Sequence, residues 1–164
     1  MAGRITKSEQ QLRPDPVHNS KVLAKFINCV MLDGKKATAQ RSMYKALEMM
    51  EKRAEREKVE GMPQSGLEIF ERAIDNVRPN VEVRSRRIGG ANYQVPMQVN
   101  HRRRQSLAFR WIINAARADS GKPIADRLAR ELYEAAKGEG KAMSTRDQTH
   151  RMAEANKAFA HFAF

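Results

Sequence analysis

Residues 78–98, RPNVEVRSRRIGGANYQVPMQ, are the part of the chain most informative about its architecture. On both sides of Gly89-Gly90, apolar and polar residues alternate with a period of two, which is the pattern of two antiparallel strands joined by a tight turn. Outside this stretch the apolar residues recur every three or four positions, which is the pattern of helices. The sequence therefore predicts a mainly α-helical protein with a two-stranded β-hairpin at about residues 79–100.

The alternation also predicts that the hairpin has two unlike faces. We expect Arg84 and Arg86 to share a cationic face with Gln94. The opposite face, turned towards the body of the protein, should hold Val81, Val83, Tyr93, Val95 and Met97. At the tip, residues 88–91 include two glycines, whose backbone a partner can approach closely. Pro96 cannot donate a hydrogen bond to a strand ladder, so the hairpin should have an exposed edge.

Six helices are expected besides the hairpin. They run from Ser20 to Asp33, from Lys35 into the charged stretch 51–60, from Ser65 to Pro79, from His101 to Ala118, from Pro123 to Lys137, and from Ser144 to Phe164. Ser65-Gly66-Leu67-Glu68 has the form of a capping box. The last helix has only a thin apolar face and should dock on another surface. That face consists of Met152, Ala155 and Phe159.

The chain of 164 residues is long enough for one domain with a single core. We expect an extended basic arm at residues 1–18, a helical core domain at 19–143 that carries the hairpin, and a C-terminal helix and tail at 144–164. The arm contains two prolines and should have little fold of its own. Its Arg4, Lys7 and Arg13 fit a phosphate-binding arm and a solvated tail equally well.

The overall charge points to a polyanionic partner. Thirty-one Lys and Arg stand against 19 Asp and Glu, which gives a net charge of +12. Nucleic acid is favoured, because cationic side chains attract phosphates and release their counterions; an acidic protein or an anionic membrane surface is the alternative. No stretch approaches the roughly 20 apolar residues that cross a bilayer. The first residues lack a secretory signal, so a soluble, cytosolic protein without a membrane partner is expected.

Half of that net charge lies in one stretch. Residues 78–104 carry seven arginines, no lysine and one acid, Glu82, and seven minus one gives +6. Arginine has a planar fork that binds phosphate bidentately and stacks on bases, which favours specific docking over a merely solvated hairpin. Arg102-Arg103-Arg104 begins a helix, where cations oppose the macrodipole and a phosphate partner would offset the cost. Arg110 continues that face.

A second, weaker basic patch is expected on the last helix. It comprises Arg146, His150, Arg151 and Lys157. A solvated helix face explains this pattern nearly as well as a binding surface does.

The sequence gives no sign of catalysis. The four histidines lie in no HExxH motif, and no GxSxG nucleophile elbow or phosphate-cradling GxxxxGK[ST] loop is present. Cys29 is the only cysteine, which excludes an internal disulfide and a Cys-rich zinc site; among its apolar neighbours it should be a small core residue. A nucleic-acid partner leaves three functions open: a structural RNA-binding protein, a DNA-binding architectural protein whose hairpin enters a minor groove, and an RNA-cleaving enzyme.

The signature Arg78–Pro96 resembles that of the small-subunit ribosomal protein seven family, bacterial type. The resemblance extends over nearly the whole chain, through Pro14–Val17, Lys25–Asn28, Asp33–Lys36 and Thr149–His161. It implies a six-helix domain with a protruding β-hairpin, in a structural, non-enzymatic protein of the small ribosomal subunit. Two departures stand out: residues 52–65 form a longer connection than usual, and Met143-Ser144-Thr145 stands where many members carry lysines.

The resemblance also implies partners. These are the 3′ major domain of 16S-type rRNA, whose binding starts assembly of the subunit head, the exit-site tRNA, the nearby mRNA path and decoding region, and small-subunit proteins nine and eleven. No cofactor and no homo-oligomer are expected. The expected rRNA-binding residues are Arg4, Lys7, Arg13, Lys35, Lys36, Arg78, Arg84, Gln94, Arg102, Arg103, Arg104 and Arg110. The expected tRNA-facing residues are Arg86, Arg87, Ile88, Gly89, Gly90, Ala91, Asn92, Tyr93, Arg146, His150 and Arg151.

Overall fold

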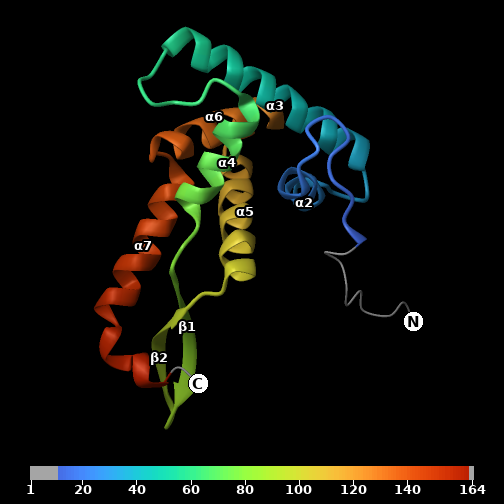
Figure 1. The fold of residues 1–164 in the computed structure, drawn as a ribbon. Coiled ribbons are helices and arrows are strands. Elements are labelled where there is room, and N and C mark those ends of the chain that lie inside the picture. The colour runs from blue at the N-terminus through green and yellow to red at the C-terminus, as the bar shows by residue number, and fades with distance from the viewer. Residues whose placement is uncertain (1–10, 163–164) are drawn as a thin grey trace, which may run out of the picture.

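The computed structural model describes residues 11–162, and within them the mainly helical class with a protruding hairpin is confirmed. Figure 1 shows a helical body from which the hairpin projects, with α7 running down beside it. The elements in chain order are α2 (Lys21–Val30), α3 (Lys36–Glu57), α4 (Gly66–Val77), β1 (Val81–Ile88), β2 (Ala91–Gln98), α5 (His101–Ala118), α6 (Ile124–Lys137), α7 (Lys141–Ala155) and the 3-10 helix η1 (Lys157–Phe162).

Three phenylalanines from three helices meet in the core. The ring of Phe26 on α2 lies edge-on to Phe70 of α4 at 5.2 Å and to Phe109 of α5 at 5.1 Å between centroids. All three side chains are fully buried. Edge-to-face pairs of this kind add to the free energy gained by burying the rings. On α3 the buried side chains include Met43, Leu47, Met50 and Ala54, which recur at helical spacing.

Cys29 is exposed, so the prediction that it is a core residue is wrong. On α2 the buried side chains are Leu23, Ala24, Phe26, Ile27 and Val30. At 100° per residue, position 29 falls off the face that these residues define. Apolar neighbours in the sequence therefore did not make Cys29 an inward-facing residue. The start of this helix was predicted correctly, because the Ser20 side chain accepts a hydrogen bond from the Leu23 N–H at 3.3 Å.

The predicted capping box of α4 is wrong in its chemistry. Ser65 occupies the N-cap position but makes no capping hydrogen bond with its side chain. Glu51 of α3 accepts a hydrogen bond from the Gly66 N–H at 2.9 Å instead. The two helices approach so closely that a Cβ on Gly66 would lie 2.6 Å from the Leu47 carbonyl oxygen. Glu51, one turn beyond Leu47, therefore reaches the helix start.

The described part of the N-terminal arm is anchored rather than loose. Asp15 is buried, and its carboxylate accepts hydrogen bonds from the N–H groups of Val17 and His18, both at 3.1 Å, and from the Tyr44 hydroxyl at 2.7 Å. Burial, with the Asp15 hydrogen bond as a second cause, raises the pKa of Tyr44 to about 12. Residues 15–18 thus form a turn fixed to α3, which differs from the extended arm that was expected.

The last helix begins earlier and ends sooner than predicted. α7 starts at Lys141, with Gly140 at its N-cap, so Ser144 and the expected boundary at 143/144 lie inside the helix. It ends at Ala155 and is followed by η1. Its buried residues are Ala142, Met143 and Ala153, whereas Met152 is 51% exposed, so the predicted apolar face is wrong. In α6 the only difference is that Pro123 lies at the N-cap, one residue before the helix.

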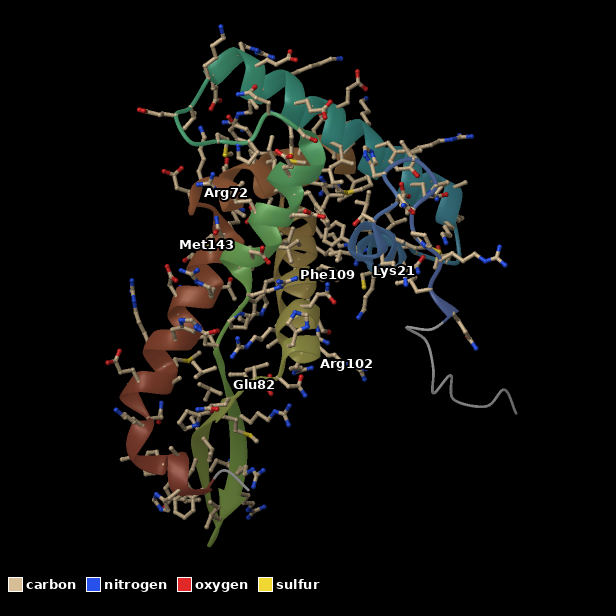
Figure 2. The ribbon with its side chains drawn as sticks, viewed as in Figure 1. Lys21, Arg72, Glu82, Arg102, Phe109 and Met143 are labelled. Carbon is tan, nitrogen blue, oxygen red and sulfur yellow. The ribbon has the colours of Figure 1, made fainter. Side chains whose placement is uncertain are left out.

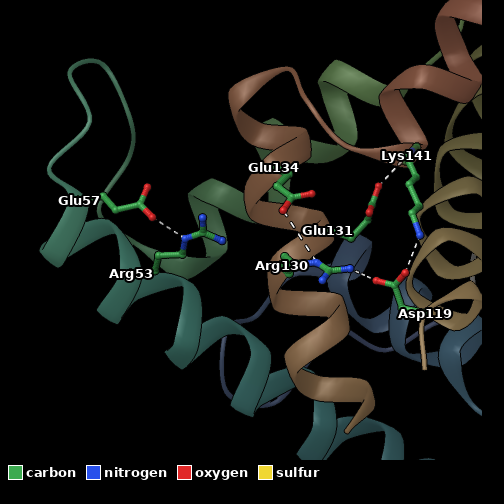
Figure 3. Close-up of polar contacts among 8 residues, drawn as sticks. Arg53, Glu57, Asp119, Arg130, Glu131, Glu134 and Lys141 are labelled. Atoms are coloured by element: carbon green, nitrogen blue, oxygen red, sulfur yellow. Dashed lines mark hydrogen bonds and ion pairs between the residues drawn. The ribbon is translucent and has the colours of Figure 1, made fainter. Parts of the chain in front are cut away.

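A buried carboxylate supplies the hydrogen bond at the start of α7. Glu131 of α6 is buried, and its Oε1 accepts from the Ala142 N–H at 2.7 Å (Figure 3). Near Glu131, Asp119 forms ion pairs with Arg130 and with Lys141, and Lys141 Nζ lies 2.5 Å from Asp119 Oδ1. Figure 3 also shows Arg53 paired with Glu57 on α3. Burial raises the pKa of Glu131 above the ordinary carboxyl value, although the Ala142 hydrogen bond acts in the opposite direction.

Glu131→Gln is expected to stabilise the protein at pH 7. The pKa of Glu131 is higher in the folded than in the unfolded state, so between these two pKa values the folded protein binds more protons. The free energy of unfolding of the parent therefore decreases as pH rises from the unfolded-state pKa to the folded-state pKa. Glutamine keeps an oxygen for the Ala142 N–H without a buried charge, and an increase of about 1 kcal/mol in the free energy of unfolding is expected.

Urea unfolding from pH 4 to pH 8 measures this effect, with the exposed Glu139→Gln as control. The parent and the control should lose stability relative to Glu131→Gln as pH rises above about 4.5. A lower stability of Glu131→Gln that appears only as pH rises above about 4.5 would show that the charge itself holds α7.

Candidate nucleic-acid interface

The hairpin forms as predicted. β1 and β2 pair antiparallel from Val81 opposite Gln98 to Ile88 opposite Ala91. Gly89 and Gly90 close the two-residue turn with φ values of +56° and +90°, a conformation that glycine adopts without strain. Among residues 11–162 the sheet contains only these two strands, so its long edges carry no further strand.

The predicted separation of the hairpin into a cationic and an apolar face is wrong. Arg84 lies opposite Val95 and Arg86 opposite Tyr93, whereas Gln94 lies opposite Ser85. Cross-strand partners project from the same face, so the two arginines share a face with apolar residues and Gln94 lies on the other face. The cause is the two-residue turn, which pairs each even-numbered residue of β1 with an odd-numbered residue of β2.

A buried acid joins the root of the hairpin to α5. Glu82 pairs through Oε1 with Arg84 Nη2 at 2.5 Å and through Oε2 with Arg103 Nε at 3.0 Å. Arg103 lies in the first turn of α5, where Asn100 caps the helix by accepting from the Arg103 N–H at 2.9 Å. Arg104 Nε donates to the carbonyl of Val99 at 2.8 Å. Figure 2 shows Glu82 on the hairpin close to the end of α5 that carries Arg102.

The 3-10 helix η1, the last described element, packs along the hairpin. Tyr93 contacts the rings of Phe159 and Phe162, with centroids 5.1 and 5.6 Å apart. Arg86 Nη1 donates to the Phe162 carbonyl at 3.2 Å. The expected docking surface of the last helical segment thus includes the hairpin of the same chain. Tyr93 and Arg86 hold this packing together, while Arg87 and residues 89–92 at the tip are exposed.

Only part of the second predicted patch faces outward. Arg146 is bound by Asp147 and by the carbonyl of Asn76, so it ties α7 to the end of α4. His150 Nε2 accepts a hydrogen bond from the Asn80 N–H at 3.2 Å. Burial, and then the charge of Arg146, lower the pKa of His150, which keeps it a neutral acceptor. Arg151 is exposed.

The other predicted rRNA-binding residues are spread over the surface. Arg78 is tied to Asp75, with Nη1–Oδ1 at 2.5 Å, and only 25% of its side chain is exposed. Arg4 and Lys7 lie outside the described residues. The residues that are exposed, and thus placed to meet a ligand, are Arg13, Lys35, Lys36, Arg84, Gln94, Arg102 and Arg110.

Three features that fix the position of the candidate interface or of the N-terminal arm were not predicted from the sequence. Glu82 stood out only as the one acid in a basic stretch, yet its position two residues before Arg84 already places both on one strand face. The anchoring of Asp15 by Tyr44 joins residues 29 positions apart, and no local pattern signals it. The same holds for the aromatic contacts of Tyr93 with the C-terminal segment.

The described residues offer neither a metal site nor a membrane span. Within residues 11–162, His, Cys, Asp and Glu side chains nowhere gather in a group of three or more that could hold a metal ion. No helix of that part of the chain is both long and apolar enough to cross a membrane.

Comparison with known proteins identifies the family. Residues 2–157 match the model of the family described as ribosomal protein S7p/S5e. The small ribosomal subunit protein uS7 of Rhodopirellula baltica is 57% identical over 162 residues, which is 99% of each chain. The proteins of the same name from Salinibacter ruber, 50% identical over the full length of both chains, and from Magnetococcus marinus, 48% identical over 99% of both, are similar relatives. The chain therefore belongs to the ribosomal protein S7p/S5e family, and it is a structural, non-enzymatic constituent of the small ribosomal subunit.

Proposed function

We propose that this protein is a primary binder of 16S-type rRNA in the cytoplasmic ribosome, that it binds the 3′ major domain, and that it nucleates assembly of the subunit head. The main support is that arginines gather where the hairpin meets α5. Arg84 from β1 and Arg103 from α5 both bind Glu82. Arg102 and Arg104 lie next to Arg103 in the first turn of α5. Guanidinium groups gathered at one junction fit the closely spaced phosphates of a folded RNA.

The surface extends beyond this junction. Lys35 and Lys36 at the start of α3 and Arg110 on α5 are exposed cations on other parts of the body. Together with the rest of the predicted rRNA-binding set, including Gln94, the N-terminal Arg4, Lys7 and Arg13, and the partly buried Arg78, they give RNA several points of attachment. Several dispersed phosphate contacts suit a protein that holds a folded RNA domain in one shape.

We also propose that the hairpin tip and the outer side of α7 face the exit-site tRNA, near the mRNA path and the decoding region, and that the protein touches small-subunit proteins nine and eleven. The tip is suited to close contact, because Gly89 and Gly90 expose backbone and Arg87 beside them is exposed. Arg151 supplies a further exposed cation on α7. The other members of the predicted tRNA-facing set act mainly through contacts within the protein. Arg86 and Tyr93 hold η1 against the hairpin, and Arg146 and His150 hold α7 against Asn76 and Asn80.

A competition assay tests the rRNA assignment. The full chain is bound to a labelled head-domain fragment of 16S-type rRNA, and unlabelled fragment or duplex DNA is added at physiological salt. We expect the rRNA fragment to compete at least 1000-fold better than duplex DNA, by analogy with the gap of about 10³ or more between specific and non-specific sites of nucleic-acid-binding proteins. Equal competition would overturn the proposal in favour of a general polyanion binder.

Arg87→Ala is expected to leave the affinity for naked rRNA within about twofold of the parent, because Arg87 lies at the tip and away from the Glu82 junction. In assembled subunits the same change should weaken tRNA at the exit site by about three- to tenfold, which lies within the net value of about 0.5–1.5 kcal/mol for one hydrogen bond. Chemical footprinting and tRNA binding to reconstituted subunits measure the two effects.

The matched control for this prediction is Arg56→Ala, which removes an exposed arginine at the opposite end of the molecule, near the end of α3 (Figure 1). It should change neither binding. A decrease of rRNA affinity in Arg87→Ala comparable to its tRNA effect would place the tip on rRNA instead.

A further inference from the structure

A buried acid lies at the centre of the most basic part of the proposed interface. Only 11% of the Glu82 side chain is exposed, against 51% for Arg84 and 37% for Arg103. The carboxylate therefore lies beneath the two guanidinium groups that it binds. A carboxylate at such a position needs ion pairs to offset the loss of its hydration.

Each oxygen of this carboxylate holds one arginine. Oε1 binds Arg84 Nη2 at 2.5 Å and Oε2 binds Arg103 Nε at 3.0 Å. Because a single carboxylate makes both contacts, guanidinium groups from β1 and from α5 are brought next to each other. Without the acid, two like charges so close together would repel each other.

The arrangement leaves both a charge and hydrogen-bond donors for a ligand. Two cations and one anion give the group a net charge of +1, which is the complement of one phosphodiester. The two ion pairs with Glu82 use one nitrogen of each guanidinium group. The remaining N–H groups of Arg84 and Arg103 are donors on side chains that are more exposed than that of Glu82. A phosphate bridging the two arginines would satisfy these donors.

We propose that Glu82 is a positioning residue, which holds Arg84 and Arg103 as a preassembled clamp for one phosphodiester group of RNA. This inference rests on the proposed rRNA-binding function. Arginine side chains have many rotamers, and fixing two of them before binding reduces the entropy lost when the phosphate arrives. Glu82 also couples the direction of the hairpin to α5, so the two guanidinium groups keep their relative position.

Long-range electrostatics alone predicts that removal of Glu82 strengthens RNA binding, which is the opposite of what a positioning role predicts. If Glu82 acted only as a negative charge near RNA, its removal would strengthen binding, because every acid in an interface repels phosphate. If Glu82 positions the clamp, its removal weakens binding although the protein becomes more basic. The sign of the change therefore distinguishes the two roles.

The test is Glu82→Gln, which keeps nearly the same volume and removes the charge. For the head-domain rRNA fragment at physiological salt, we expect affinity to fall by about five- to tenfold. The slope of log K against log salt should become shallower by up to about 0.7–0.9, the value for one phosphate that the variant no longer neutralises. Glu154→Gln is the matched control: it removes an exposed acid of α7, and its affinity should stay equal or rise slightly.

A thermodynamic cycle separates positioning from general destabilisation. In the Arg84→Ala/Arg103→Ala background, Glu82→Gln should cause no further decrease of affinity, because its effect passes through those two side chains. Thermal unfolding of each variant accompanies the binding measurements. Unchanged or tighter rRNA binding by Glu82→Gln with an unchanged salt slope would overturn the inference, and so would an equal decrease in the double-variant background. Failure of the proposed function is distinct, because it appears in the parent protein as equal competition by duplex DNA.

Discussion

Phe26→Ala should lower the free energy of unfolding by about 3–5 kcal/mol, the usual cost of truncating a buried aromatic residue to alanine. The ring is fully buried and lies edge-on to both Phe70 and Phe109. Its removal leaves a cavity where α2, α4 and α5 meet, and it also removes two aromatic contacts. Urea unfolding followed by circular dichroism measures the decrease. Unfolding should remain cooperative, because α3, α4 and α6 keep their own contacts.

Cys29→Ala is the matched control on the same helix. Cys29 is exposed, so its truncation should change the free energy of unfolding by no more than about 0.5 kcal/mol. If Cys29→Ala cost as much as Phe26→Ala, the orientation of α2 in the fold would be wrong. A decrease below about 1 kcal/mol for Phe26→Ala would mean that the site collapses around the missing ring.

The elements with a strong local signal were predictable. The period of two around Gly89-Gly90 located both strands and the turn, and His101–Ala118 was predicted with the bounds that α5 has. These features depend on residues close together in the sequence, and their periodicity is read directly. The chemistry at the helix starts was less predictable, since a side chain from another element can satisfy the same N–H groups. Glu51 does so at α4 and Glu131 at α7.

For the candidate site, the sequence indicated which residue types gather but not how they face. The arginine count between residues 78 and 104 marked the candidate interface. The predicted division of the hairpin faces was wrong, because it depends on the cross-strand register that the two-residue turn sets. Arg146 and His150 looked like surface cations, and tertiary contacts with Asn76 and Asn80 turned them inward. Contacts between residues about 70 positions apart leave no periodic trace in the sequence.

Arg84→Ala combined with Arg103→Ala should lower the affinity for the head-domain rRNA fragment by about 10- to 100-fold at physiological salt, the cost of removing charged hydrogen bonds to one phosphate. The slope of log K against log salt should become shallower by about 0.7–0.9. Each single variant should already show most of this slope change, because both arginines bind one shared phosphodiester and the second substitution then costs less than the first. A slope change of about 1.4–1.8 in the double variant would mean that each arginine meets a phosphate of its own.

The control removes the same two charges elsewhere. Lys45→Ala/Arg56→Ala replaces two exposed cations of α3 and lowers the net charge equally. If attraction were a property of net charge alone, both double variants would bind more weakly to the same extent. Phosphate contacts act at short range, and charges are screened within about 8–10 Å at physiological salt. Only Arg84→Ala/Arg103→Ala should therefore change the slope of log K against log salt. An equal change in both would place the rRNA contacts away from Glu82 and its two arginines.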